Sequence, residues 1–263
     1  MKKITYKERA TFYIQEVKKD YKKIKLLKAI KDKYDITSMA LCPCASGVYL
    51  RECSEIFKES YFIDIEKTMI NIINNQKEQQ SIKNVKTYIC DMKNINELKI
   101  ECDCIFALDQ GIQYLNYSNF KNFLENSYSV TKYIVLELFD FNLGKTLTYY
   151  DSKIEDNKFY FSKQFTFNDL NIKRYNKHIH YKTHIEFWYQ YFNKDNLVFE
   201  TNFKLYNYEY NMIKKIVDKS NKFVIQEKNE DENRPDSGSC LRRKKQKSGR
   251  TGAESGTYKG RKH

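Results

Sequence analysis

The sequence predicts an α/β fold, a mostly parallel sheet with helices on both faces and an antiparallel β insertion after strand five. Two observations support this prediction. From residue 37 to residue 140, short apolar runs alternate with longer segments in which apolar residues recur at helical spacing. After Gly144, apolar residues occupy every second position, which is typical of half-buried antiparallel strands.

The first half of the chain is predicted to alternate helices with buried strands. Strands that are apolar on both faces and alternate with helices form parallel sheets, which right-handed crossovers connect. The expected elements are a helix within 6–34, a strand at 37–42, a helix at 48–58, a strand at 60–64, a helix at 67–79, strands at 84–91 and 102–109, a helix at 117–129 and a strand at 132–140.

Three runs of the second half carry an aromatic or aliphatic residue at alternate positions, and we expect each set to share one face of a strand. The sets are Phe159, Phe161, Phe165 and Phe167, then Ile185, Phe187, Tyr189 and Tyr191, and then Leu197, Phe199, Phe203 and Leu205. The sequences EDN and NKDN are expected to form hairpin turns. A last helix and strand are predicted within residues 207–228.

The composition changes abruptly at Asn229. Five of the eight glycines and five of the eight arginines lie in residues 229–263, where apolar residues show no period. A segment that buries little apolar surface cannot offset the entropy of ordering, so we expect a basic, disordered tail at 229–263. Residues 1–228 are predicted to form one domain, with the antiparallel insertion at about 145–206.

The positive charge is divided between this tail and the rest of the chain. The tail holds ten Lys or Arg residues against five Asp or Glu residues, so it carries +5 of the formal net charge of +13. The remaining charge is spread along residues 1–228. A diffuse charge is weak evidence for nucleic-acid binding, because a binding surface concentrates its cations.

The sequence also indicates a compartment. It has no run of eighteen apolar residues, and its N-terminal segment lacks the apolar stretch of a secretory signal. We therefore expect a cytoplasmic protein with no membrane contact. The seven cysteines include two CxC pairs within apolar runs. Buried reduced thiols are expected and no metal site, because zinc sites usually pair their cysteines as CxxC.

Acidic residues end three of the predicted strands, at Asp64, Asp91 and Asp109. In open parallel sheets, ligands bind outside the carboxyl ends of the strands, where the strand order reverses. Asp64 follows Gly47 by 17 residues, a spacing suited to a carboxylate that accepts hydrogen bonds from two vicinal hydroxyls. Asp91 is placed to accept from an exocyclic amine. Each of these residues, taken alone, is also a common helix N-cap.

Several motifs from about Met39 to Phe139 stand in the order of a known family. MALCPCASGVYL corresponds to its first strand and glycine-rich turn, YFIDIEKTMINII to its ribose-binding strand and helix, TYICDM to its adenine-side acid and CDCIFALDQGIQYL to its fourth strand. The chain thus resembles the class I S-adenosylmethionine-dependent methyltransferases. With the antiparallel layer and LYNYEYNMIKKIVDKSNKFVI, it is similar to the small-molecule branch, including amino-sugar N-methyltransferases and glycine N-methyltransferase. The resemblance covers most of residues 5–228 and implies a Rossmann-like fold with S-adenosyl-L-methionine as cofactor.

The glycine-rich turn departs from the family pattern. Pro43 and Ala45 occupy glycine positions, Leu41 stands where an acid is frequent, and only Gly47 is retained. We expect the cradle to be altered but usable, because the helix that begins after Gly47 still offers free N–H groups. The resemblance implies that the cofactor lies against Cys42, Ala45, Gly47, Asp64, Ile65, Asp91, Met92 and Leu108.

Methyl transfer from a sulfonium is one in-line displacement, so the protein mainly positions the reactants, and a base helps where the acceptor arrives as an ammonium. The predicted catalytic residues are His178, His180 and Tyr114. We expect His178, His180 and His184 to share a strand face with Glu186, a face that fits a base, a metal site or a polar edge in solvent. Further candidates at strand ends are Asp109, Gln110, Glu137 and Asp140.

Three functions are compatible with these residues. The leading hypothesis is methylation of a small-molecule acceptor, on an amine of an amino sugar or a related metabolite. The alternatives are an RNA or protein methyltransferase that uses the basic tail, and a cofactor-binding scaffold that has lost catalysis. The aromatic content of the insertion, which includes Trp188, predicts a wall of the acceptor pocket or a homodimer contact, with a Tyr-rich face in water as the alternative.

Overall fold

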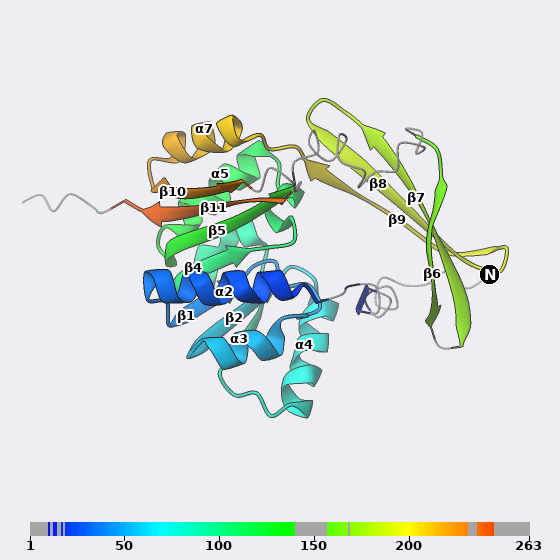
Figure 1. Cartoon of the computed structure of the whole chain (residues 1–263), viewed down its shortest axis with the longest axis horizontal. Coiled ribbons are helices and arrows are strands. Elements are labelled where there is room, and N and C mark those ends of the chain that lie inside the picture. The colour runs from blue at the N-terminus through cyan, green and yellow to red at the C-terminus, as the bar shows by residue number, and fades with distance from the viewer. Residues whose placement is uncertain are drawn as a thin grey trace, which may run out of the picture.

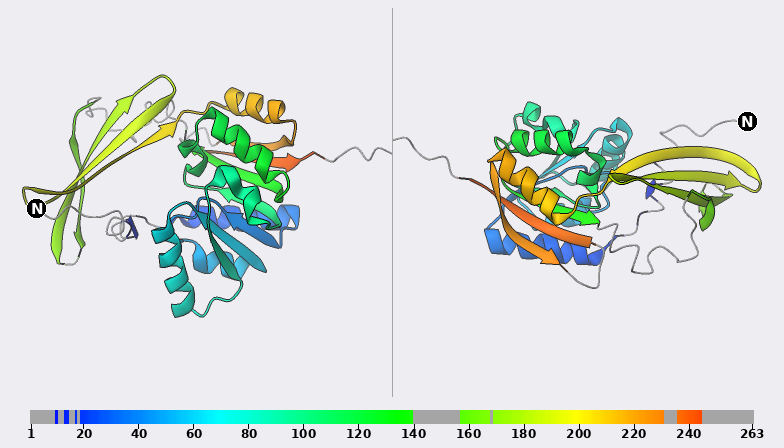
Figure 2. Two further views of the ribbon diagram at one scale, coloured as in Figure 1. Left: turned by 180° about the vertical axis from the view of Figure 1, so that it is seen from behind. Right: turned by 90° about the horizontal axis from the view of Figure 1, so that it is seen from above.

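The computed structural model describes residues 10, 13, 14, 17, 19–139, 157–167, 169–230 and 236–244. A larger sheet flanked by helices lies beside a smaller, strongly curved antiparallel sheet (Figure 1). The smaller sheet lies on the side to which the carboxyl ends of the parallel strands point, and the views in Figure 2 agree on this arrangement.

The larger sheet has seven strands in the order β10-β11-β5-β4-β1-β2-β3. Its strands are β1 (Ser38–Leu41), β2 (Glu59–Asp64), β3 (Val85–Ile89), β4 (Cys102–Ala107), β5 (Thr131–Phe139), β10 (Phe223–Glu230) and β11 (Asp236–Arg243). Strand β1 pairs in parallel with both β2 and β4, so the strand order reverses there. This reversal brings the carboxyl ends of β1, β2 and β4 around one crevice.

Helices cover both faces of this sheet. One face packs against α2 (Tyr21–Tyr34), α3 (Leu50–Ile56) and α4 (Lys67–Gln79), and the other against α5 (Tyr117–Ser127), α7 (Tyr210–Ser220) and the 3-10 segments η1 (Met92–Leu98) and η2 (Gly111–Tyr114). Alternate residues of β1 enter the two cores, Met39 and Leu41 on the α2 side and Ala40 on the α5 side. Within the described part of the chain, none of these helices is long and apolar enough to cross a bilayer.

A strand lies inside the segment that was expected to be a tail. β11 pairs antiparallel with β5 on one side and with β10 on the other. Cys240 and Leu241 are buried, so a short apolar stretch completes the sheet although the segment shows no apolar period. The expectation of disorder from residue 229 is wrong for 229–230 and 236–243, and residues 245–263 lie outside the described part.

The smaller sheet has the order β6-β7-β8-β9 and is antiparallel throughout. Its strands are β6 (Tyr160–Phe167), β7 (Leu170–His180), β8 (His184–Asn193) and β9 (Asn196–Tyr206). The predicted insertion after β5 is therefore confirmed over residues 160–206, and residues 145–156 lie outside the described part.

One predicted strand face is divided in two. Phe161 and Phe159 are 54% and 39% exposed, whereas Phe165 and Phe167 pack into the apolar core of the smaller sheet. The cause is a β-bulge between Phe161 and Lys163, which adds one residue and inverts the alternation of the side chains. The prediction of a common face for all four phenylalanines is wrong.

Candidate active site

The turn after β1 keeps the backbone of a glycine-rich loop although it contains a single glycine. Ala45 has a φ of 45° and Gly47 a φ of 71°, so both lie in the left-handed region that glycine enters without steric cost. A Cβ at Gly47 would lie 2.7 Å from Ile73 Cγ1 on α4. Glycine is therefore required where the turn packs against this helix, and Ala45 accepts some strain.

Pro43 is accommodated by a glycine from another part of the chain. A Cβ on Gly111, the first residue of η2, would lie 2.3 Å from Pro43 Cδ. The proline ring thus lies directly against the Gly111 backbone, and the connections that follow β1 and β4 pack together. The sequence analysis missed this pair, because the two residues lie far apart in the chain.

Asp64 ties the end of β2 to the turn. Its Oδ2 accepts a hydrogen bond from the Ala45 N–H at 2.8 Å, and its Oδ1 accepts one from the Glu66 N–H at 3.0 Å. Burial raises the pKa of Asp64, while hydrogen bonds from the Glu66 and Ala45 N–H groups oppose this effect. Each oxygen has a second lone pair, so the carboxylate can accept two further hydrogen bonds from vicinal hydroxyls.

Ile65 follows Asp64 directly, and Ile89 is the register partner of Asp64 on β3. Ile65 is 59% exposed, and Ile89 at the end of β3 is 51% exposed, whereas Met92 and Leu108 are buried. Exposed aliphatic side chains beside a buried hydrogen-bonding group are typical of a site for a flat, partly apolar ligand. The residues present therefore fit an adenosyl group.

Asp91 caps η1. Its Oδ1 accepts from the Lys93 N–H at 3.2 Å, and its Oδ2 lies 2.9 Å from Lys93 Nζ. The N-cap alternative for this residue is thus observed. Its side chain is 26% exposed, so the carboxylate can still accept a hydrogen bond from an exocyclic amine.

A lysine of α2 joins two carboxylates at the same edge of the sheet. Lys23 Nζ forms an ion pair with Asp109, in the connection after β4, and lies 2.8 Å from Glu137 Oε2 on β5. The same Oε2 accepts a hydrogen bond from the Asp109 N–H at 2.6 Å. The Lys23 and Glu137 side chains are 12% and 13% exposed, and that of Asp109 is 51% exposed. Lys23 gave no signal in the sequence, because it stands among many lysines at helical spacing.

Lys23 is stabilised as a cation by the two carboxylates beside it. Burial lowers the pKa of Lys23, but Glu137 and Asp109 outweigh burial, and the pKa is raised. Burial raises the pKa of Glu137, and Lys23 opposes this effect. The ion pair of Asp109 with Lys23 uses Oδ1, and the Asp109 side chain is 51% exposed.

Tyr114 links η2 to the smaller sheet. Tyr114 is 52% exposed, and its ring centroid lies 5.8 Å from that of Phe203 on β9. Phe203 stacks on Phe187 at 5.2 Å, and Phe187 meets His178 edge-on at 4.7 Å. His178 is 5% exposed, and its Nε2 lies 3.3 Å from the Tyr160 hydroxyl. Two of the predicted catalytic residues, Tyr114 and His178, therefore belong to one aromatic row, with two phenyl rings between them.

The other histidines occupy two faces. His178 and His180 lie on β7, whereas His184 and Glu186 lie on β8, because the chain reverses at residues 181–183. The cross-strand register places His178 and His180 on the buried face of the hairpin, and His184 and Glu186 on the opposite face. The prediction of a single face is wrong. The turn went unrecognised because it contains no glycine, asparagine or aspartate.

Comparison with known proteins decides the class of this domain. A family model described as a methyltransferase domain matches residues 42–133, which contain the turn, Asp64, Asp91 and η2. Residues 42–133 are a methyltransferase domain. None of the curated proteins matches the sequence.

Solved methyltransferase structures share the fold over nearly the whole chain. An S-adenosylmethionine-dependent methyltransferase from Clostridium acetobutylicum ATCC 824 is 15% identical with a TM-score of 0.71, covering 90% of this chain and 98% of that one. CalS10, an amino pentose methyltransferase from Micromonospora echinaspora, is 11% identical with a TM-score of 0.64, covering 93% and 100%. The sugar N-methyltransferase KedS8 from Streptoalloteichus sp. ATCC 53650 is 10% identical with a TM-score of 0.67, covering 93% and 95%.

The methyltransferase domain and the fold confirm the resemblance to the class I S-adenosylmethionine-dependent methyltransferases. They also confirm the mostly parallel sheet with an antiparallel insertion after β5.

Proposed function

We propose that this methyltransferase transfers a methyl group from S-adenosylmethionine to the amine of a small molecule, with amino sugars as the favoured class. The observation that carries the proposal is the cluster of Asp109, Glu137 and Lys23 at the carboxyl edge, followed in η2 by the exposed residue Tyr114. A carboxylate attracts a protonated amine, and an aromatic ring offers a sugar a flat apolar surface. The shared fold with an amino pentose and a sugar N-methyltransferase supports the same class.

The cofactor side of the proposal rests on the turn and the strand ends. Asp64 would accept hydrogen bonds from the ribose hydroxyls, Ile65 and Ile89 would pack on the adenine, and Asp91 would accept from its amino group. When bound, the cofactor supplies an electrophilic methyl group on a sulfonium. The left-handed backbone at Ala45 and Gly47 supports cofactor binding, because the turn keeps its shape although Ala45 replaces a glycine.

On the acceptor side, Asp109 is proposed to bind the ammonium through Oδ2 and to accept its proton, since the half-exposed carboxylate can pass that proton to solvent. Glu137 would hold Asp109 in place in two ways. Its carboxylate accepts a hydrogen bond from the Asp109 N–H group, and it pairs with Lys23, which also pairs with Asp109. Tyr114 would form the wall of the acceptor space. As proton acceptor, Asp109 is favoured over the predicted His178, because Phe187 and Phe203 lie between the His178 imidazole and Tyr114.

A labelling experiment tests the proposal. The full chain is incubated with S-adenosylmethionine that carries a trideuterated methyl group, together with nucleotide-linked amino sugars and their hydroxyl counterparts. Mass spectrometry is expected to find the label on nitrogen. Asp109→Asn should lower kcat/KM by about 10²- to 10⁴-fold, the usual range for losing an acid–base group.

Asp32→Asn is the matched control, because Asp32 lies on α2 with a side chain 75% exposed. It should retain wild-type kcat/KM. Label on oxygen alone, or equal losses in the two variants, would contradict the proposal. Binding of S-adenosylhomocysteine with no turnover of any amine would favour the scaffold alternative.

A further inference from the structure

A second site lies at the opposite edge of the larger sheet. A surface pocket of about 580 Å³ lies between the start of β5 and the end of β11, and it is lined by Tyr128, Ser129, Lys132, Tyr133, Arg242, Arg243 and Lys244. This volume is within the range of ligand sites. Because a strand rises about 3.3 Å per residue, the length of β5 places the pocket on the order of 25 Å from the carboxyl edge.

The pocket gathers cations. Arg242 is paired in register with Tyr133 of β5, so the next residues along, Arg243 and Lys132, lie side by side on neighbouring strands. Lys244 follows directly. Among the residues that the structure describes, no carboxylate forms an ion pair with Arg242, Arg243 or Lys244. Like charges at this separation repel each other unless an anion lies among them.

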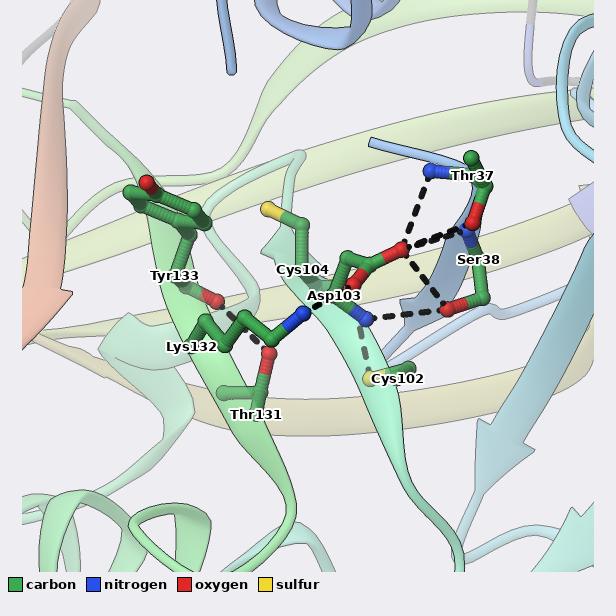
Figure 3. A network of polar contacts seen from close by, with 8 residues as sticks. All are labelled: Thr37, Ser38, Cys102, Asp103, Cys104, Thr131, Lys132 and Tyr133. Carbon is green, nitrogen blue, oxygen red and sulfur yellow. Dashed lines mark hydrogen bonds and ion pairs between the residues drawn. The ribbon is translucent and has the colours of Figure 1, made fainter. Parts of the chain in front are cut away.

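Among the described residues, the carboxylate that pairs with a lining cation is that of Asp103 on β4, whose partner is Lys132. Its Oδ1 accepts from Lys132 Nζ at 2.9 Å, and its Oδ2 accepts from the N–H and hydroxyl groups of Thr37 and Ser38 at 3.0–3.1 Å (Figure 3). Asp103 raises the pKa of Lys132, and Arg243 opposes this effect. Asp103 can thus neutralise one of the four lining cations.

Neutral acceptors hold two of the other cations in place. Arg243 Nη1 donates to the Tyr128 carbonyl at 3.1 Å, and Lys244 Nζ donates to Asn221 Oδ1 at 2.7 Å. Lys222 adds a further cation, with Nζ 4.6 Å from the centroid of the Tyr128 ring. These contacts orient the side chains without cancelling their charge, which is the preorganisation that favours binding of an anion.

We infer that this pocket binds the phosphate backbone of a nucleic acid. Arg and Lys side chains are the usual partners of backbone phosphates, and such contacts do not depend on base sequence. The chain continues from Lys244 into residues 245–263, which hold six Lys or Arg residues and one Glu. Positive charge that extends beyond the pocket suits a polymer of phosphates better than a single phosphorylated metabolite. The site lies opposite the methyl-transfer edge, so it would tether the enzyme to nucleic acid without presenting a base for methylation.

Fluorescence anisotropy with a fluorescein-labelled 20-nucleotide poly(U) RNA tests this inference on the full chain. Binding should weaken as NaCl rises, because each phosphate contact releases counterions. The double variant Arg242→Gln/Lys244→Gln should bind roughly tenfold more weakly at 100 mM NaCl and should reduce the slope of log K against log salt by about 1.4, or about 0.7 for each phosphate contact to a single strand. The measurement requires no S-adenosylmethionine, so its outcome is independent of the proposed methylation.

The matched control is Arg51→Gln/Lys86→Gln, which removes the same charge from side chains that are 72% and 57% exposed elsewhere on the molecule. It should keep the wild-type salt slope. Absence of RNA binding at 50 mM NaCl, or the same loss in both double variants, would overturn the inference. Displacement of the RNA by pyrophosphate as effectively as by unlabelled poly(U), at equal phosphate concentration, would also overturn it in favour of a small-phosphate site.

A measurement on the wild-type chain covers the case in which the double variant fails to fold. Lysines are acetylated with a water-soluble reagent in the presence and absence of poly(U), and the modified peptides are quantified by mass spectrometry. RNA is expected to protect Lys132 and Lys244 and to leave Lys86 unchanged. Equal acetylation of Lys132 and Lys244 with and without RNA would contradict the inference.

Discussion

Asp64 shows how one side chain serves both the fold and the proposed site. Its two oxygens accept backbone N–H groups from the turn after β1 and from the start of α4, which stabilises the turn in the absence of any ligand. The carboxylate is 7% exposed, and a buried charge is tolerated only with such hydrogen bonds. A ligand with two vicinal hydroxyls would donate two further hydrogen bonds to the Asp64 carboxylate.

Asp64→Ala is therefore expected to weaken the binding of S-adenosylhomocysteine by about 1.5–3 kcal/mol, the range for losing hydrogen bonds to a charged group. Isothermal titration measures the change, and circular dichroism establishes that the variant is folded. Asp64→Asn keeps one acceptor oxygen, so its dissociation constant for S-adenosylhomocysteine should lie between those of Asp64→Ala and the wild type. An unchanged dissociation constant in folded Asp64→Ala would remove this residue from the cofactor site.

At the scale of elements, the site is assembled where two connections meet. Pro43 belongs to the turn after β1 and Gly111 to η2 after β4, and a Cβ at Gly111 would overlap the Pro43 ring. The same principle operates at the other edge of the sheet, where Asp103 joins the beginning of β1 to β5 through Ser38 and Lys132.

Gly111→Ala should destabilise the protein by about 1–3 kcal/mol, the usual cost of overpacking, because the added Cβ would overlap the Pro43 ring. Pro43→Gly in the same chain should recover most of this loss, since it removes the atoms that clash. Urea unfolding of the wild type, both single variants and the double variant gives the coupling energy. Additive effects of the two substitutions would show that the residues do not touch.

Asp103→Asn should lower the free energy of unfolding by about 1.5–3 kcal/mol at pH 7. Burial would raise the pKa of Asp103, but hydrogen bonds from Lys132, Thr37 and Ser38 outweigh burial and hold it well below its ordinary value. The stabilisation is therefore present above the unfolded-state pKa of about 4 and is lost as the pH falls below it.

Urea unfolding between pH 7 and pH 2 measures this dependence. The difference between Asp103→Asn and the wild type should shrink below about pH 4. Glu101→Gln is the control, since Glu101 is an exposed neighbour, and it should change the free energy of unfolding little at any pH. A difference for Asp103→Asn that stays constant down to pH 2 would contradict the role of the carboxylate charge.

At the scale of the whole molecule, the larger sheet is continuous only because β11 lies between β5 and β10. Its backbone hydrogen bonds satisfy one edge of each neighbour, and Leu241 is fully buried. The C-terminal segment is thus part of the core at 236–243, and its charged continuation at 244 begins at the amino edge of the sheet.

Deletion of residues 229–263 should abolish cooperative thermal unfolding, because the loss of a central strand exceeds the usual stability of a domain of about 5–15 kcal/mol. Deletion of residues 245–263 should leave the melting temperature close to that of the full chain, since no described contact is lost. Differential scanning calorimetry compares the two. Equal melting temperatures for both deletions would mean that β11 contributes nothing to the fold.

The sequence determined the fold class and the position of the acidic residues at the ends of the strands, because both depend on local patterns. The spacing of apolar residues within a segment indicates whether it is a buried strand or a helix. The helix at 67–79 and the four strands β1 to β4 were therefore predicted close to their observed bounds. Asp64 was predicted at the carboxyl end of its strand from the apolar run before it and its spacing from the turn, whereas its hydrogen bonds to Ala45 and Glu66 depend on the conformation of the turn and of the start of α4.

Tertiary structure decided the features that depend on residues far apart in the chain. Lys23 and Asp109 are separated by 86 positions, and no local pattern distinguishes this lysine from its exposed neighbours. The segment that forms β11 has little apolar content of its own, and it is ordered because β5 and β10 each offer it a row of unpaired backbone groups. The periodicity of apolar residues along a strand indicates which side chains are buried. It does not indicate which strands a polar strand such as β11 pairs with, or which residues neutralise a buried charge such as Lys23, because those partners come from distant parts of the chain.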